Sequence, residues 1–142
     1  MSAAAFAAAW LVAAAAQAPT VPEGVHSAVR GPTTICGMTA SSVGELRTKV
    51  AAAGLHRQDA GPHFEAFDSD MTDREMVQWA FTLPGEAAYP AVTCRHVYKT
   101  AGGAWRMERD MRCDASRAAC DALFIQFRDL DEQARQELQR GR

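Results

Sequence analysis

The sequence lacks a concentration of charge of either sign. Its 142 residues include 15 basic and 17 acidic side chains, which give a formal net charge of −2, and no block of like charge stands out. Nucleic acids and anionic membrane surfaces are bound through concentrated basic patches. We therefore expect neither a nucleic acid nor a membrane surface as the partner.

Motifs that mark common active sites are also missing. No serine lies in a GxSxG or SxxK arrangement, and Gly102–Gly103 is a turn sequence rather than a GxGxxG before a helix. The cysteines show neither CxxC spacing nor the spacing of a zinc site, although Cys94-Arg95-His96 approaches it. The sequence supports no enzyme class positively, and we expect no cofactor and no metal ion.

No apolar run is long enough to cross a bilayer, which needs about 20 residues. The longest run, Ala3–Ala16, instead matches the centre of a secretory signal and is followed by the small-x-small triplet Ala16-Gln17-Ala18. Basic residues before the run are absent and Pro19 is unfavourable after the cleaved bond, so a buried helix or a tail is the alternative. We predict a signal peptide over 1–18, export to the periplasm or the medium, and no membrane span after its removal.

Four cysteines, an even number behind an export signal, indicate two disulfides. The favoured connectivity joins Cys113 to Cys120, across the corner between the last strand and the last helix, and Cys36 to Cys94, which ties the lead-in to the sheet. The alternative connectivity joins Cys94 to Cys120 and Cys36 to Cys113. A reactive thiol is the competing hypothesis, and the even count argues against it.

Two helices are predicted from capping residues and apolar spacing. Ser42 and Glu45 form a capping box that opens a helix of about three turns, which Gly54 ends. A long helix starts near Ser116 and ends at Gly141, with apolar residues spaced three and four apart along one side. The apolar seam consists of Cys120, Leu123, Phe127, Leu130 and Ala134, and the opposite face carries Arg128, Asp129, Asp131, Glu132, Arg135 and Glu137.

About four strands are predicted between the helices. Two runs, 63–67 and 76–83, are joined by a polar connection, and a hairpin pairs 91–99 with 104–113. Consecutive strands joined by short turns form an antiparallel sheet, and we expect both helices to cover one face of it. The predicted organisation is a signal peptide over 1–18, an extended lead-in over 19–40 and a single α+β domain over 41–142.

The hairpin separates apolar from charged side chains if Gly102–Gly103 form a two-residue turn. In that register the apolar residues of both strands share the core face, whereas Arg109 lies near an edge or against a partner carboxylate. The outer face is the candidate binding surface, and the sheet edge can accept an added strand. The core-face residues are Val92, Cys94, His96, Tyr98, Trp105, Met107, Met111 and Cys113. The candidate binding surface consists of Arg95, Lys99, Arg106, Glu108, Asp110 and Arg112.

An acidic connection and scattered histidines are the remaining candidates for chemistry. Alternating carboxylates can collect calcium, yet an EF-hand would need glycine and glutamate where Asp73 and Trp79 stand, so we favour a solvated turn. A zinc site would need histidines from distant segments to converge. The acidic residues are Asp68, Asp70, Asp73 and Glu75, and the histidines are His26, His56, His63 and His96.

These observations favour a small exported, disulfide-stabilised binding module without catalytic activity, whose partner is a protein or a component of the cell envelope. The alternative is a small exported hydrolase or metal-dependent enzyme that uses Asp68, Asp70, His63 or His96. A third hypothesis is a structural subunit held in an oligomer by its last helix. Convergence of the four side chains in one cleft would favour the enzyme, and a filled core with these side chains scattered would favour the binding module.

Overall fold

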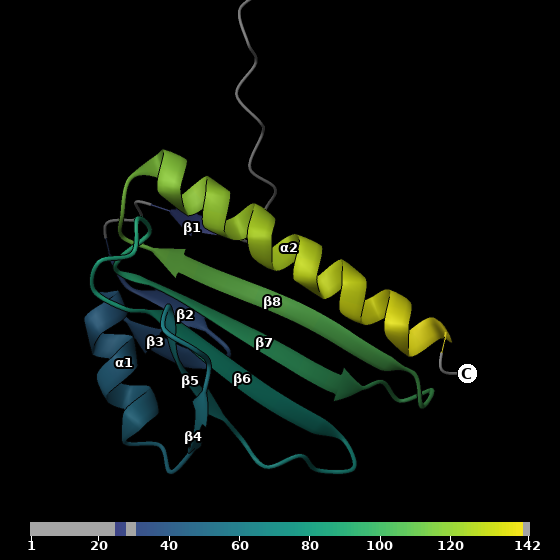
Figure 1. The fold of residues 1–142 in the computed structure, drawn as a ribbon. Helices are drawn as coiled ribbons and strands as arrows, with labels where there is room; N and C mark the ends of the chain where they lie inside the picture. Colours follow the sequence, from purple (N-terminus) through teal and green to yellow (C-terminus); the bar gives the residue numbers. More distant parts are fainter. Residues whose placement is uncertain (1–24, 28–30, 141–142) are drawn as a thin grey trace, which may run out of the picture.

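The main sheet has six strands in the order β1-β8-β7-β6-β5-β4 (Figure 1). The computed structural model describes residues 25–27 and 31–140, so the predicted signal peptide lies outside the described residues. The strands from β4 to β8 pair antiparallel with their neighbours in sequence, and β1 pairs in parallel with β8. The strands are β1 (Val25–Ser27), β4 (His56–Asp59), β5 (Phe64–Asp68), β6 (Glu75–Thr82), β7 (Ala91–Lys99) and β8 (Trp105–Cys113).

A second, two-stranded sheet lies within the predicted lead-in. Its strands, β2 (Thr33–Ile35) and β3 (Met38–Ala40), pair antiparallel. The turn between them consists of Cys36 and Gly37, with φ angles of 42° and 79°, which is the pattern of the two-residue turns that suit hairpins. Ile35 and Ala40 are buried in the core, so this part of the predicted lead-in is packed structure.

Helix α1 (Val43–Ala51) begins at the predicted capping box. The Ser42 hydroxyl accepts a hydrogen bond from the Glu45 N–H, and the Glu45 carboxylate accepts one from the Ser41 N–H. The first bond satisfies a donor that the first helical turn leaves without a partner, and the second fixes the residue before the N-cap. Val43, Leu46 and Val50 recur at helical spacing and form the buried stripe.

Helix α2 (Arg117–Arg140) starts after Ser116, whose hydroxyl accepts a hydrogen bond from the Ala119 N–H. It runs along β8 toward the far end of the β7–β8 hairpin (Figure 1). Cys120, Leu123 and Phe127 face the sheet and are buried, as the apolar spacing predicts. The prediction is wrong for Leu130, which the same spacing placed in the seam and which is 49% exposed. In the part of the chain that the structure describes, no helix combines the length and apolar character needed to span a membrane.

The two helices cover opposite faces of the main sheet. The residues of α1 pack with Trp79, Phe81 and Val92, whereas those of α2 pack with Ala80 and Met111. Trp79 and Ala80 are neighbours in β6, and neighbouring residues of a strand point to opposite faces. The predicted α+β class, antiparallel sheet and two flanking helices are confirmed, but the expectation that both helices share one face is wrong.

The turn of the β7–β8 hairpin explains this difference. Lys99 pairs with Trp105, and the Thr100 N–H donates to the Ala104 carbonyl across a turn in which Gly103 has a φ of 83°. The turn therefore has one residue more than the predicted two-residue turn. A register shift of one residue moves every side chain to the other face. The predicted core-face residues of β7 consequently face α1 and those of β8 face α2, and each set needs its own helix.

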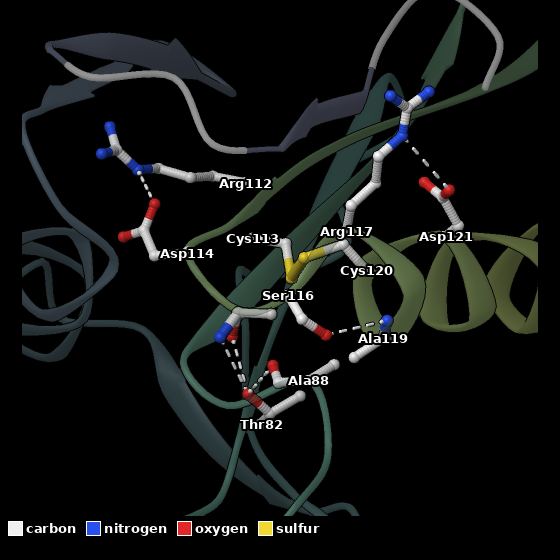
Figure 2. The surroundings of a disulfide bond; sticks show 11 residues. Thr82, Ala88, Arg112, Cys113, Asp114, Ser116, Arg117, Ala119, Cys120 and Asp121 are labelled. Atoms are coloured by element: carbon white, nitrogen blue, oxygen red, sulfur yellow. Dashed lines mark hydrogen bonds and ion pairs between the residues drawn. A yellow bond between two sulfur atoms is a disulfide. The ribbon is translucent and has the colours of Figure 1, made fainter.

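The two disulfides have the predicted connectivity. Cys113–Cys120 closes the corner between the end of β8 and the first turns of α2 (Figure 2). Cys36–Cys94 joins the β2–β3 turn to the α1 side of β7. Each disulfide therefore attaches a peripheral element to one strand of the β7–β8 hairpin.

Candidate functional site

A groove of about 930 Å³ lies between the C-terminal half of α2 and the part of the β7–β8 hairpin that is next to its turn. Its apolar floor contains Val97 and Met107, which pair directly across the two strands. Trp105 continues the floor and is 37% exposed. Ala134 is the small residue that α2 presents to this region. Because a methyl group covers little of the facing sheet, apolar surface remains accessible.

Charged residues of both signs border the groove. Arg95, Arg106 and Arg135 line it, as do Glu108 and Glu137. Burial lowers the pKa of Arg95, and repulsion from Arg109 lowers it further. An arginine nevertheless stays charged throughout the physiological pH range, so Arg95 presents a cation beside the apolar floor.

A partly buried polar network, to which the groove residue Arg95 belongs, lies beside the groove. Arg109 donates to both carboxylate oxygens of Asp131, at 2.6 and 2.7 Å, and to the Thr93 hydroxyl at 2.8 Å. Its guanidinium also lies over the Phe127 ring, 4.6 Å from the centroid. The partner carboxylate, one of the two predicted surroundings of Arg109, is thus confirmed. The network holds α2 against the sheet by charge-assisted hydrogen bonds.

The network continues from Asp131 across the sheet to β5. Arg95 lies 3.7 Å from Asp131 and donates to the Gln78 amide oxygen at 2.7 Å. The Gln78 amide group donates to Asp68 at 3.2 Å. These contacts orient the Arg95 guanidinium, so one cation of the groove is held in place before any ligand arrives.

The expectation that six charged residues share one exposed face is wrong. Arg95 and Lys99 alternate with the residues of β7 that face α1 and therefore lie on the α2 side. The register pairs His96 with Glu108 and Val92 with Arg112, and directly paired residues share a face. The other four residues of the predicted surface accordingly lie on the α1 side. These four are Arg106, Glu108, Asp110 and Arg112.

Arg112 is buried, with 3% exposure, and serves the fold. Its guanidinium donates to the carbonyl oxygens of Gly31, Ala40 and Ser41 and pairs with Asp114 at 3.0 Å. It also donates to the Thr33 hydroxyl. Arg112 therefore anchors the β2–β3 hairpin to β8 and is withdrawn from the surface.

His56, His63 and His96 each pair with a different carboxylate. His56 pairs with Asp70, His63 with Glu86 and His96 with Glu75, at 2.7 to 2.9 Å. Asp68 instead accepts from Gln78 on the α2 side. Within residues 25–27 and 31–140, no three or more histidine, cysteine, aspartate or glutamate side chains gather in a group that could hold a metal ion. The His26 side chain lies outside the described part.

Asp131 is the site residue that the sequence prediction placed on the wrong face of the helix. It is 4% exposed, although its charge suggested the solvated side. Its position does carry a signal, because it follows Phe127 by four residues and Leu123 by eight, a spacing that keeps residues on one helical face. An acidic residue within an apolar seam indicates a buried cation on the facing element.

No family model, curated protein or solved structure matches the chain. The function is therefore argued from the arrangement of the chain's own residues.

Proposed function

We propose that the chain is a small exported binding module without catalytic activity, which binds a protein or a cell-envelope component in the groove between α2 and the β7–β8 hairpin. The observation that carries the proposal is the apolar floor of Val97, Trp105 and Met107 beside a pre-oriented Arg95. Binding sites combine apolar surface with a few fixed polar groups in this way. His63 and His96 pair with Glu86 and Glu75 rather than with Asp68 or Asp70, which also favours binding over hydrolysis.

A matched pair of substitutions on α2 tests the groove. Ala134→Gln fills it, whereas Ala118→Gln makes the same chemical change at an exposed position of the first helical turns. Wild-type, Ala134→Gln and Ala118→Gln proteins are immobilised, and proteins retained from an envelope extract of the producing cells are quantified by mass spectrometry. We expect a partner that is retained by wild type and Ala118→Gln and is reduced about tenfold, or by about 1.4 kcal/mol, by Ala134→Gln. Equal retention by both variants would contradict the proposal.

The export part of the proposal has a separate test. Supporting observations are the two disulfides, which persist in oxidising compartments, and the signal-like run Ala3–Ala16. We expect the mass of the exported protein to correspond to cleavage after Ala18, with four thiols that react with an alkylating agent only after reduction. A chain that retains residues 1–18, or thiols that react without reduction, would contradict it.

A further inference from the structure

In the part of the chain that the structure describes, no strand pairs with the outer edge of β8 where it borders the groove. Among the described residues, β1 is the strand on this edge, and it pairs only with Met111–Cys113. Within residues 25–27 and 31–140, the stretch of β8 between Trp105 and Asp110 pairs with β7 alone. Arg106 and Glu108 line the groove although their side chains lie on the face away from α2. The groove therefore extends from the α2 face of the sheet to the edge of β8.

The ladder with β7 decides which backbone groups of β8 point toward this edge. The Ala104 carbonyl accepts from the Thr100 N–H, and the Asp114 N–H donates to the Pro90 carbonyl. The even-numbered residues of β8 therefore direct their backbone groups toward β7. Bonded and non-bonded residues alternate along an antiparallel pair. Trp105, Met107 and Arg109 consequently direct their N–H and C=O groups away from β7.

A contact from α2 supports this assignment of the backbone groups. Arg135 Nη2 donates to the carbonyl oxygen of Met107 over 3.5 Å, so this carbonyl faces the groove side of the edge. The distance is at the long limit for a hydrogen bond, and the Arg135 side chain is 47% exposed. An incoming N–H group can therefore replace Arg135 without disturbing the core.

The side chains along the edge specify the chemistry of an added strand. Trp105 and Met107 lie on the α2 side, whereas Arg106 and Glu108 lie on the other side. Glu108 is held by the Tyr98 hydroxyl, which donates to it at 2.7 Å. Opposite charges on neighbouring strands attract and like charges repel. A strand that fits this edge has apolar residues toward the groove, an acidic residue beside Arg106 and a basic residue beside Glu108.

We propose that an extended segment of a partner protein adds to the outer edge of β8 between Trp105 and Asp110, in the groove that α2 borders. The segment lies end to end with β1, which already occupies the same edge beside Met111–Cys113. In such strand addition the main-chain hydrogen bonds supply affinity and alternate side chains supply specificity. The inference rests on the proposed function, because it names the form in which the partner enters the groove.

Two peptides that differ only in charge order test the inference. Val-Glu-Val-Lys-Val matches Arg106 and Glu108 when it runs parallel to β8, and Val-Lys-Val-Glu-Val matches them when it runs antiparallel; each is flanked by threonines. Binding to the exported protein is measured by calorimetry. We expect one peptide to bind with a Kd of about 0.1 mM. Arg106→Glu should weaken this peptide about tenfold, and replacing the peptide glutamate by lysine should restore binding.

Backbone methylation distinguishes strand addition from side-chain binding. Only alternate N–H groups of an added strand bond to β8. For the antiparallel peptide, N-methylation of the valines should weaken binding at least about tenfold, whereas N-methylation of the charged residues should not. For the parallel peptide, N-methylation of the charged residues should weaken binding and N-methylation of the valines should not. The inference is overturned if neither peptide binds at about 1 mM, or if both sets of methyl groups have equal effects.

The remaining outcomes separate this inference from the proposed function. Loss of the captured partner with Ala134→Gln, together with no binding of either peptide, would leave the proposed function standing and overturn strand addition. Peptide binding that follows the methylation pattern, without any partner retained from the envelope extract, would support strand addition and count against the proposed partner class. Sedimentation of the chain alone tests whether a second copy of the chain occupies the edge. A dimer that Arg106→Glu dissociates would assign the edge to self-association and overturn the inference.

Discussion

Removal of the Asp131 carboxylate should detach α2 from the sheet more strongly than any exposed substitution on that helix. Asp131→Leu leaves the partly buried Arg109 guanidinium beside Arg95 without its two charge-assisted bonds. Breaking a buried pair by removing one partner costs about 3 to 5 kcal/mol. The Arg109 side chain keeps 13% exposure, so we expect the lower end, about 3 kcal/mol.

Urea unfolding followed by circular dichroism measures this loss. With a slope of about 1.5 kcal/mol per molar urea, a loss of 3 kcal/mol lowers the midpoint by about 2 M. Asp129→Leu is the matched control, because Asp129 is 57% exposed on the same helix and should change stability by about 0.5 kcal/mol or less.

The double variant decides whether the pair acts as a unit. Arg109→Met together with Asp131→Leu removes both buried charges, so it should cost far less than the sum of the two single changes. We expect a coupling energy of at least about 2 kcal/mol. A coupling energy below about 0.5 kcal/mol would refute the role of this pair in holding α2.

Three further predictions concern the stability that each disulfide contributes, the pKa of Tyr98 and the loss of stability at acid pH. Loss of Cys36–Cys94, which closes 58 residues, should cost about 1.9 kcal/mol more than loss of Cys113–Cys120, which closes 7; equal costs in urea would contradict the loop-length account. The hydrogen bond to Glu108 raises the pKa of Tyr98 above its ordinary 10.0, so absorbance titration should show it fall with Glu108→Ala; no change would contradict the β7–β8 register. Hydrogen bonds from Lys49 and then the Ser41 N–H lower the pKa of Glu45, so its contribution to stability is present above pH 4.5 and lost as pH falls through the lowered pKa, and Glu45→Gln should flatten that decline.

The local elements of the fold were predictable because their signals are local. The pair Ser42 and Glu45 marks the start of α1, and the spacing from Cys120 to Phe127 marks the buried side of α2. The disulfide pairing was also predictable, because Cys113 and Cys120 flank a single strand-to-helix corner. Each of these inferences depends on residues that are close in sequence.

The face of each hairpin residue was not predictable from the same information. The sequence Ala101-Gly102-Gly103-Ala104 is compatible with turns of two or three residues, and Gly103 takes the positive φ that the longer turn requires. A difference of one residue exchanges the faces. It separated the predicted charged surface into two parts and created a second apolar face, which α2 covers only in part.

The groove was not predicted, for the same reason. Val97 and Met107 lie on opposite faces in the predicted register and side by side in the observed one. Asp131 was assigned to the solvated face from its charge, although its spacing from Phe127 places it on the buried one. The pattern of side chains within each strand or helix therefore identified the charged residues. Their positions around the groove depend on how the strands and the helix pair, which that pattern does not specify.

Site-specific photo-crosslinking in the exported protein tests the central claim most directly. Benzoylphenylalanine replaces Trp105 on the groove floor in one protein and Met71, which is 64% exposed outside the residues that line the groove, in another. We predict that irradiation in the producing cells yields a discrete adduct from the groove position and none from the loop position, and that Ala134→Gln removes this adduct. No adduct from the groove position, or the same adducts from both positions, would contradict the account.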